Sequence, residues 1–220
     1  MAQRFTSVNV FAALLVAAIV SLRTGSGVLA ENDGLTTPFE TMDYKLTKAT
    51  LADTAEIEAL IKQSVWALAR DDYSDAQIEG ALRAAWGIDT QLIEDGTYFV
   101  ATLESQIIGC GGWSFRETLF GNDNESGRNP RALDPENDPA KIRAFFVRPE
   151  HARKGLGTLL LEKCEAEAEA KGFSRFSLMA TLPGRRLYSR YGYIAQPAIQ
   201  YPLAENLSIE FVPMYKELSV

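Results

Sequence analysis

The sequence has little histidine and little cysteine, and each shortage excludes a class of site. A single histidine, His151, cannot form a multi-histidine metal site. A serine hydrolase would have to use that histidine, and no Gly-x-Ser-x-Gly turn accompanies it. The two cysteines, Cys110 and Cys164, are too few for a disulfide framework or a metal-binding quartet. Cys110 falls in an apolar strand-like run and Cys164 in a helical run, and a small buried hydrophobe is the expected role of both. No metal is therefore expected, and hydrolase mechanisms are disfavoured.

Basic residues are also in short supply. The formal net charge is −7 at pH 7, whereas a non-specific nucleic-acid-binding protein needs a basic surface against the phosphates. Nucleic acid is therefore not an expected partner, and the charge weakly favours a cationic substrate. The 220 residues are 46% hydrophobic, without an excess of Gly or Pro, which is typical of one ordered domain with a short extension.

The N-terminal segment has no acidic residue before Glu31 and contains the longest apolar run, residues 10–20, between Arg4 and Arg23. This run is short for a membrane span but has the length of a signal-peptide core. Residues 28–30 (VLA) resemble a cleavage site. Arg23, however, lies between the apolar core and that site, which argues against export.

Residues 1–41 are therefore set apart as a signal-like, anchoring or disordered extension, with a transit segment or an upstream start also open. Met42 stands directly before the first expected element, so residues 42–220 are expected to form the domain. A cytoplasmic domain is expected; the alternative is export or organelle targeting through residues 1–30. Contact with a membrane is expected only if residues 10–20 are retained as an anchor.

The body of the chain alternates strand and helix patterns. Period-two and apolar runs predict strands over residues 44–49, 97–103, 107–115, 141–147, 173–180, 193–195 and 208–216. Helical spacing and capping residues predict helices over residues 52–69, 74–87, 157–171 and 184–191. The helix at 157–171 is the sole element between two strands, so those strands should be parallel neighbours in a βαβ unit. Residues 117–140 form a long polar connection, which is expected to be functional or disordered.

The most informative stretch is residues 145–160, FFVRPEHARKGLGTLL. A strand ends, a loop turns, and a helix begins at Gly155 and Gly157. The free N–H groups of a first helical turn, at its positive end, form an anion site. A dinucleotide-binding fingerprint would need a third glycine where Leu160 stands, and a P-loop would need Lys after the glycines. Both alternatives fail, although a tight turn with incidental basic residues is not excluded by the glycines alone.

This stretch resembles motif A of the GNAT superfamily of N-acetyltransferases. Val147, Pro149, Gly155 and Gly157 fall into register with that motif, and Ala152 departs from its usual Gln or Arg. A second segment, Leu187-Tyr188-x-x-x-Gly192-Tyr193, looks like the family's (Phe/Leu)-Tyr-x-x-x-Gly-(Phe/Tyr) segment. The resemblance implies an α/β fold: one GNAT-like domain whose mixed, mostly antiparallel sheet has a central parallel βαβ unit flanked by helices.

The resemblance also implies a cosubstrate, acetyl-CoA. Its pantetheine arm would bond the exposed edge of the strand at 141–147 as an extra strand, and its pyrophosphate would lie on the loop and first helical turn. The implied binding residues are Phe145, Phe146, Val147, Ala152, Arg153, Lys154, Gly155, Leu156, Gly157 and Thr158. Backbone N–H groups near Phe146 and Val147 are the implied donors to the thioester carbonyl.

Tyr188 matches the family's usual general acid, which protonates the departing thiolate. The alternative for Tyr188 is a core aromatic that only packs. The general base is open: the strand at 141–147 contains no acid, so a water relay, or an acid of the long connection such as Glu117 or Asp138, would have to serve. His151 is interpreted as an exposed loop residue.

The expected function is transfer of an acetyl group from acetyl-CoA to an amine of a small molecule or protein. The alternative within the same fold is a non-catalytic acyl-CoA-binding sensor or regulatory domain. A weaker third hypothesis, a secreted or anchored binding protein, rests only on residues 10–20. The expected partners are acetyl-CoA and an amine acceptor; a homodimer is left open. The acceptor itself cannot be predicted from the sequence.

Overall fold

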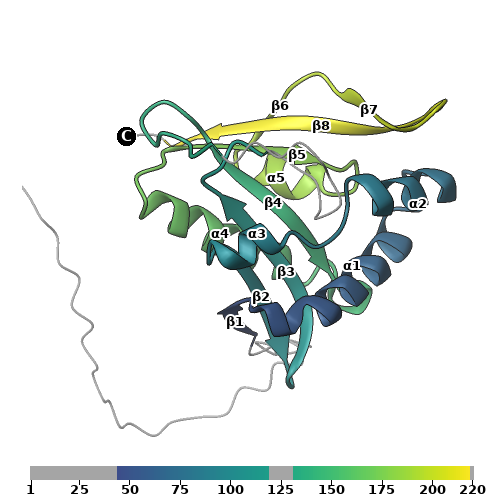
Figure 1. Ribbon diagram of the computed structural model, residues 1–220, viewed down its shortest axis with the longest axis horizontal. Helices are drawn as coiled ribbons and strands as arrows, with labels where there is room; N and C mark the ends of the chain where they lie inside the picture. Colours follow the sequence, from purple (N-terminus) through teal and green to yellow (C-terminus); the bar gives the residue numbers. More distant parts are fainter. Residues whose placement is uncertain (1–43, 119–130, 219–220) are drawn as a thin grey trace, which may run out of the picture. The chain divides into compact units, whose positions relative to one another are not determined.

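The computed structural model describes residues 44–118 and 131–218. The apolar run at residues 10–20, and with it every prediction about the extension at 1–41, lies outside the described residues (Figure 1). Among the described residues, no helix is long and apolar enough to span a bilayer.

A mixed sheet forms the centre of the domain (Figure 1). Its strands run in the order β1-β2-β3-β4-β5-β8-β6, and β7 pairs with β8. In chain order they are β1 Lys45–Lys48, β2 Tyr98–Leu103, β3 Gln106–Ser114, β4 Ala140–Val147, β5 Arg175–Ala180, β6 Ile194–Ala195, β7 Ile199–Ala204 and β8 Leu207–Glu217. Every pairing is antiparallel except that of β4 with β5. The predicted mixed sheet with a central parallel pair is confirmed.

Helices cover both faces of this sheet. They are the α-helices α1 Thr54–Leu68, α2 Asp75–Ala84, α3 Thr90–Glu94, α4 Leu156–Glu169 and α5 Arg185–Arg190, with short 3-10 turns η1 Leu51–Asp53 and η2 Pro149–His151. Helix α4 is the crossover between the parallel strands β4 and β5, as the sequence pattern predicts. In Figure 1 the strands β2 to β4 lie between α4 on the left and α1 and α2 on the right.

The helices on the first face are fixed by their caps and their apolar stripes. Thr50 and Asp53 cap the start of η1 reciprocally, and Ser74 and Gln77 do the same for α2. One face of α1 is buried, with Ser64 as a polar member among its apolar residues Ile57, Leu60, Ile61 and Val65. The buried positions recur at helical spacing, and the helix predicted over residues 52–69 is confirmed as α1 with the 3-10 turn η1 before it.

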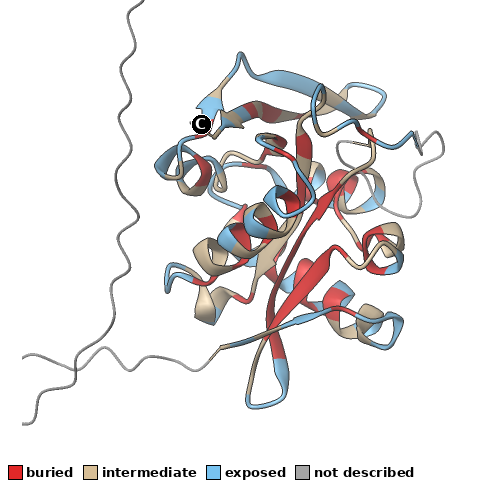
Figure 2. Cartoon of the chain, turned by 90° about the vertical axis from the view of Figure 1, so that its left-hand side faces the viewer, coloured by how far each residue is buried: buried red, intermediate tan, exposed pale blue. Residues whose placement is uncertain are grey.

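The hydrophobic core consists of two clusters, one on each side of the sheet. We call the cluster that contains α1, α2 and α3 the α1 face; it includes Trp86 and Phe211. The cluster that contains α4 is the α4 face; it includes Tyr188 and Tyr193. Figure 2 shows the strands between them as a continuous buried band. Both cysteines are buried and free, as expected, and burial raises the pKa of the Cys110 thiol to about 12.

The glycines of β3 make room for neighbouring side chains rather than for a ligand. The glycine-rich sequence of this strand predicts a bulge, and β3 has one on its β2 side: the neighbours Ala101 and Thr102 oppose Gly109 and Ile107. A Cβ on Gly111 would lie 2.9 Å from the ring of Phe145. Gly111 therefore leaves room for the Phe145 ring, so the space beside this glycine is filled by a protein side chain and not by a ligand.

Two elements are missing from the sequence-based prediction. Helix α3 spans only five residues, which is too short to show an amphipathic period. Strand β7 carries Pro202 and pairs with β8 alone, and proline is tolerated in a strand only where no ladder bond is needed from its nitrogen. Both elements owe their conformation to tertiary contacts, which single-sequence patterns do not reveal.

Candidate active site

The parallel strands β4 and β5 separate toward their carboxyl ends. β4 pairs with β5 only from Ala140 to Ile142, whereas it stays paired with β3 as far as Val147. The half of β4 from Arg143 to Val147 therefore has a backbone edge that faces no strand. A cavity of about 1200 Å³ opens at this edge and is lined from both core clusters. Its volume exceeds the range of about 300–1000 Å³ usual for one drug-sized ligand, so it can hold two reactants.

A bulge in β4 lies at the point where the strands part. Ala144 has a positive φ of 57°, a conformation that costs an L-residue energy and persists only where its surroundings hold it. The Tyr98 hydroxyl supports it by donating to the Ala144 carbonyl at 3.3 Å. The strained residue therefore lies within the cavity lining, beside Phe145.

Backbone N–H groups beyond the bulge alternate between β3 and the gap. The N–H of Arg148 donates to the Ile108 carbonyl on β3 at 2.8 Å, so the preceding N–H, that of Val147, points the other way. It donates to the hydroxyl of Ser64 on α1 at 3.3 Å. This bond is long for an N–H···O contact. The N–H predicted to serve a cosubstrate thus faces the cavity, with a side-chain hydroxyl as its partner.

The start of α4 has the geometry of an anion site. Gly155, the N-cap, has a φ of 87°, and Arg153 before it has a φ of 64°. The first N–H groups of a helix have no carbonyl within the helix to bond, and a Cβ on Gly155 would meet no atom within 4 Å. The N-terminal end of α4 therefore combines free N–H donors, the positive end of the helix dipole and space for a ligand to approach. These features fit a pyrophosphate.

The predicted cosubstrate-binding residues converge on this cavity with two exceptions. The lining includes Phe145, Phe146, Val147, Ala152, Arg153, Gly155, Gly157 and Thr158. Lys154 is exposed and Leu156 is buried in the α4-face core, and neither side chain lines the cavity. Leu156 packs where Gly109 leaves space, since a Cβ there would lie 2.8 Å from its Cδ2. Only the backbone of Leu156 is available to a ligand.

Tyr188 lies on α5, opposite β4. Its ring meets that of Phe145 edge to face with centroids 6.3 Å apart, and that of Tyr193 at 5.8 Å. The residue is buried and lines the cavity. Burial raises the pKa of the Tyr188 phenol above its ordinary value, so the group stays protonated at neutral pH. The tyrosine is thus both packed and accessible from the cavity.

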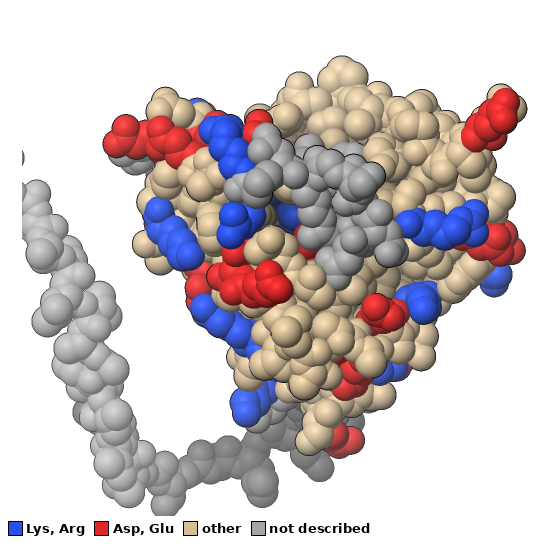
Figure 3. Space-filling view, viewed as in Figure 1, with Lys and Arg blue, Asp and Glu red and all other residues tan. Residues whose placement is uncertain are grey.

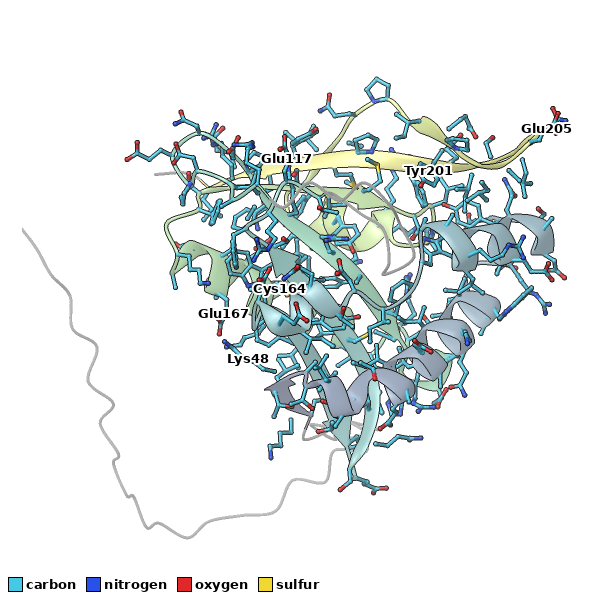
Figure 4. The ribbon with its side chains drawn as sticks, viewed as in Figure 1. Lys48, Glu117, Cys164, Glu167, Tyr201 and Glu205 are labelled. Atoms are coloured by element: carbon cyan, nitrogen blue, oxygen red, sulfur yellow. The ribbon has the colours of Figure 1, made fainter. Side chains whose placement is uncertain are left out.

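One prediction about a titratable group needs correction, and two of the alternatives left open for the general base lie away from the cavity. His151 is half-buried, not an exposed loop residue: it lines the cavity and meets the Tyr44 ring edge to face at 6.5 Å. Glu117, labelled in Figure 4, follows β3 and pairs with Arg131 at 2.9 Å. Asp138 pairs with the same arginine at 3.3 Å. Neither carboxylate lines the cavity, so neither is placed to act as the base.

The expectation that residues 117–140 shape the site is tested only in part, because residues 119–130 lie outside the described residues. The described ends extend the hairpin of β3 and β4 away from the cavity: Glu117 donates its N–H to the Arg131 carbonyl, and Leu133 donates to that of Phe115. None of these described ends lines the cavity.

Five charged residues of the described cavity lining are not predicted from the sequence: Asp72, Arg143, Arg185, Arg186 and Arg190. Asp72, in the turn between α1 and α2, is the one carboxylate in the cavity lining formed by residues 44–118 and 131–218. Arg143 of β4 is buried and forms a 2.7 Å ion pair with the buried Asp89, so its charge is balanced within the protein. No sequence motif marks Asp72 or Arg143, because only the fold brings the turn after α1 and the strand β4 to the same cavity. On the face shown in Figure 3, basic and acidic side chains are interspersed, so neither sign dominates.

Comparison with known proteins agrees with this geometry. The family model described as the acetyltransferase (GNAT) family matches residues 62–193. The chain belongs to the GNAT acetyltransferase family. The match spans β4, the loop, α4 and the segment with Tyr188, so both motifs that carried the resemblance lie inside it. No curated protein sequence matches the chain.

Solved structures share the fold at low sequence identity. A GCN5-related N-acetyltransferase structure from Rhodopseudomonas palustris aligns with a TM-score of 0.58 at 21% identity, covering 79% of this chain and 95% of that one. The PaiA N-acetyltransferase from Thermoplasma acidophilum, in complex with coenzyme A, aligns with a TM-score of 0.53 at 16% identity, covering 80% and 99%. Family and fold together support acetyl transfer as the general activity. Among the described residues, no cluster of three or more His, Cys, Asp or Glu side chains could hold a metal ion.

Proposed function

We propose that the protein is an N-acetyltransferase that moves the acetyl group of acetyl-CoA to an amine. One observation carries the proposal: the half of β4 that does not pair with β5, the start of α4 and Tyr188 line a single cavity. An open strand edge, an anion site and a proton donor are the three parts that this reaction needs on the cosubstrate's side.

The cosubstrate is proposed to bind in two parts. Its pantetheine arm lies along the edge of β4 and bonds the backbone near Phe145 and Val147. Its pyrophosphate lies against the N–H groups from Arg153 to Thr158. Binding there requires Val147 to release the hydroxyl of Ser64, and the 3.3 Å length of that bond makes the exchange inexpensive.

The transfer itself forms a C–N bond and breaks a C–S bond. The lone pair of a neutral amine attacks the thioester carbon, while the cavity-facing backbone N–H of Val147 stabilises the charge that develops on the carbonyl oxygen. The sulfur leaves as a thiolate and takes the phenolic proton of Tyr188. The amine nitrogen loses one proton, which returns to the tyrosinate through solvent. Acetyl-CoA and an amine thus yield an amide and free CoA thiol.

The amine must be deprotonated before it attacks, and neither Glu117 nor Asp138 lines the cavity. Asp72 and His151 are the described lining residues that carry a carboxylate or an imidazole. We assign proton removal to solvent water in the cavity. A chain of waters needs no residue in contact with the amine, and it agrees with the absence of an acid on β4.

The proposal is tested in two steps with the full chain. Titration calorimetry with CoA and with acetyl-CoA measures binding, and incubation with labelled acetyl-CoA and a broad panel of amines measures transfer. Binding with transfer supports the enzyme. Binding without transfer to any amine would favour the non-catalytic sensor instead, and a folded protein that binds neither compound would end both interpretations.

A further inference from the structure

The acceptor's chemistry can be inferred from the part of the cavity that lies on the α1 face. There the lining belongs mostly to the α1-face core, beside the hydroxyl side chains of Ser64 and Thr181. Its apolar side chains include Val65, Ala69, Trp86, Met179, Leu182 and Phe211, which we call the acceptor wall. Val65, Ala69, Trp86 and Phe211 are each at most 7% exposed. A surface of this kind gains free energy by covering apolar groups and offers few partners to hydroxyl or amide groups.

Aromatic residues stand behind the wall and fix its shape. Tyr73 meets Trp86 with ring centroids 5.8 Å apart, and Trp86 meets Phe211 at 6.3 Å. Tyr201 of β7, labelled in Figure 4, packs on Phe211 at 6.1 Å. Each contact is close enough to restrict the rings. The wall is thus a preformed surface whose two aromatic members, Trp86 and Phe211, are backed by Tyr73 and Tyr201.

Hydrogen bonds close the same region. The Tyr73 hydroxyl accepts from the N–H of Leu182 and donates to the carbonyl of Glu210, both at 2.8 Å. Gln77 of α2 donates through Nε2 to the carbonyl of Ser208 at 2.8 Å. These bonds join the α1–α2 region directly to β8 and to the segment before α5.

The packing of α2 reinforces this closure. Gly80 of α2 abuts Leu203 of the β7–β8 hairpin, with 3.0 Å from a Cβ built there to its Cδ1. Glu205, labelled in Figure 4, marks the tip of that hairpin, beyond the contact. An extended polypeptide needs a groove between separated elements, and here the elements that would flank it are bonded to one another. The closure favours a small acceptor.

Among the described lining residues that come from α1, α2 and the segments joining them, Asp72 is the one charged side chain. It is exposed while it lines the cavity, so it lies where the cavity meets solvent. Arg143 is balanced by Asp89, and the remaining basic residues of the lining, Arg153, Arg185, Arg186 and Arg190, belong to the loop before α4 and to α5. A single carboxylate at an apolar entrance attracts one cationic group.

We propose that the acceptor is a small primary amine carried on an apolar body, such as a 2-arylethylamine, and that Asp72 attracts its ammonium group to the cavity. This inference rests on the proposed N-acetyltransferase function. The apolar body lies on the acceptor wall, and the nitrogen reaches the gap in β4 after losing its proton.

The test compares acceptors at saturating acetyl-CoA with the full chain. The panel holds 2-phenylethylamine, ethylamine, ethanolamine, spermidine and a short peptide with a free N-terminus. The expected kcat/KM for 2-phenylethylamine exceeds that for ethylamine by about tenfold or more, since even one buried methylene is worth about that much. Preference for ethanolamine, spermidine or the peptide would overturn this inference about the acceptor but leave the proposed N-acetyltransferase function intact. No transfer to any amine would overturn the proposed N-acetyltransferase function itself.

Two variants locate the effect. Asp72→Asn should raise the KM for 2-phenylethylamine about two- to fivefold, with less effect at high salt, and leave kcat and CoA affinity unchanged. Asp71→Asn is the matched control, an exposed neighbour outside the lining, and should change nothing. Leu68→Gln, on the half-buried part of α1 that lines the cavity, should reduce the preference for 2-phenylethylamine over ethylamine. An unchanged KM in Asp72→Asn, or an equal change in Asp71→Asn, would contradict the role of Asp72.

Discussion

The ring of Phe145 on β4 meets the ring of Tyr188 on α5 edge to face, with centroids 6.3 Å apart and an interplanar angle of 69°. This contact joins the strand that would hold the acetyl group to the residue that would protonate the departing sulfur. Gly111 permits this ring contact, because the absence of a side chain there leaves the space that the Phe145 ring occupies. Tyr188 therefore combines two roles, ring packing against Phe145 and proton donation by its phenol, and variants are needed that change one role at a time.

Tyr188→Phe keeps the ring and removes the proton donor. We expect kcat to fall roughly a hundredfold, the range for loss of one general acid, with CoA affinity and thermal stability nearly unchanged. Because burial raises the pKa of Tyr188, the phenol stays protonated and wild-type kcat should not fall between about pH 7 and pH 9. Steady-state kinetics across this range decides. An unchanged kcat in the variant would reduce Tyr188 to a packing residue.

Gly111→Ala tests the packing side of the same contact. The new Cβ would lie 2.9 Å from two ring carbons of Phe145, so the ring must move toward the gap. We expect the free energy of unfolding to drop by about 1–3 kcal/mol, the usual cost of overpacking, and kcat to fall with it. Chemical denaturation gives the first quantity. Adding Phe145→Leu should recover part of the stability; a purely additive double variant would show that the two residues do not interact.

Gly157→Glu tests the anion site. The substitution places bulk and negative charge at the first turn of α4, where a pyrophosphate is proposed to bind, so CoA binding should be lost. Gly157→Ala is the matched control: its Cβ would meet only the flexible end of Leu187, at 3.2 Å, and it adds no charge. Calorimetry on both variants, with circular dichroism to confirm folding, makes the comparison. Full CoA affinity in folded Gly157→Glu would place the pyrophosphate elsewhere.

The sequence predicts those parts of the molecule whose chemistry is local. The loop before α4 is recognisable because a helix start near an anion needs Gly155 and Gly157 in fixed positions, and a βαβ unit follows from the order of its elements. The acceptor side is different. Asp72, Trp86 and Phe211 stand far apart in the chain and share no spacing rule, so only the folded sheet shows that they line one cavity.

Errors in the prediction have the same origin. Glu117 was a reasonable candidate base by composition, but its position is set by its ion pair with Arg131, which no local pattern reveals. His151 was assigned to solvent because it lies in a loop, yet the Tyr44 ring covers part of it. Strand β7 was missed because Pro202 is a poor strand residue anywhere except at an edge.

The extent of the domain is a separate proposal. A chain beginning at Met42 should fold cooperatively and bind CoA as well as the longer chain does, because β1 starts at Lys45 and residues 31–41 carry no apolar period that could pack. Thermal unfolding and calorimetry of the two chains make the comparison. Aggregation of the shorter chain alone would show that the apolar run at residues 10–20 belongs to the core.

The central claim, acetyl transfer from acetyl-CoA to an amine with Tyr188 as the acid, is tested most directly by counting products. Free thiol and acetylated amine are measured together, with wild-type protein and with Tyr188→Phe, in the presence and absence of 2-phenylethylamine. The account predicts thiol release that depends on the amine, matches the acetylated amine one to one, and slows roughly a hundredfold in the variant. Thiol release that ignores the amine, or none at all from a protein that binds CoA, would contradict it.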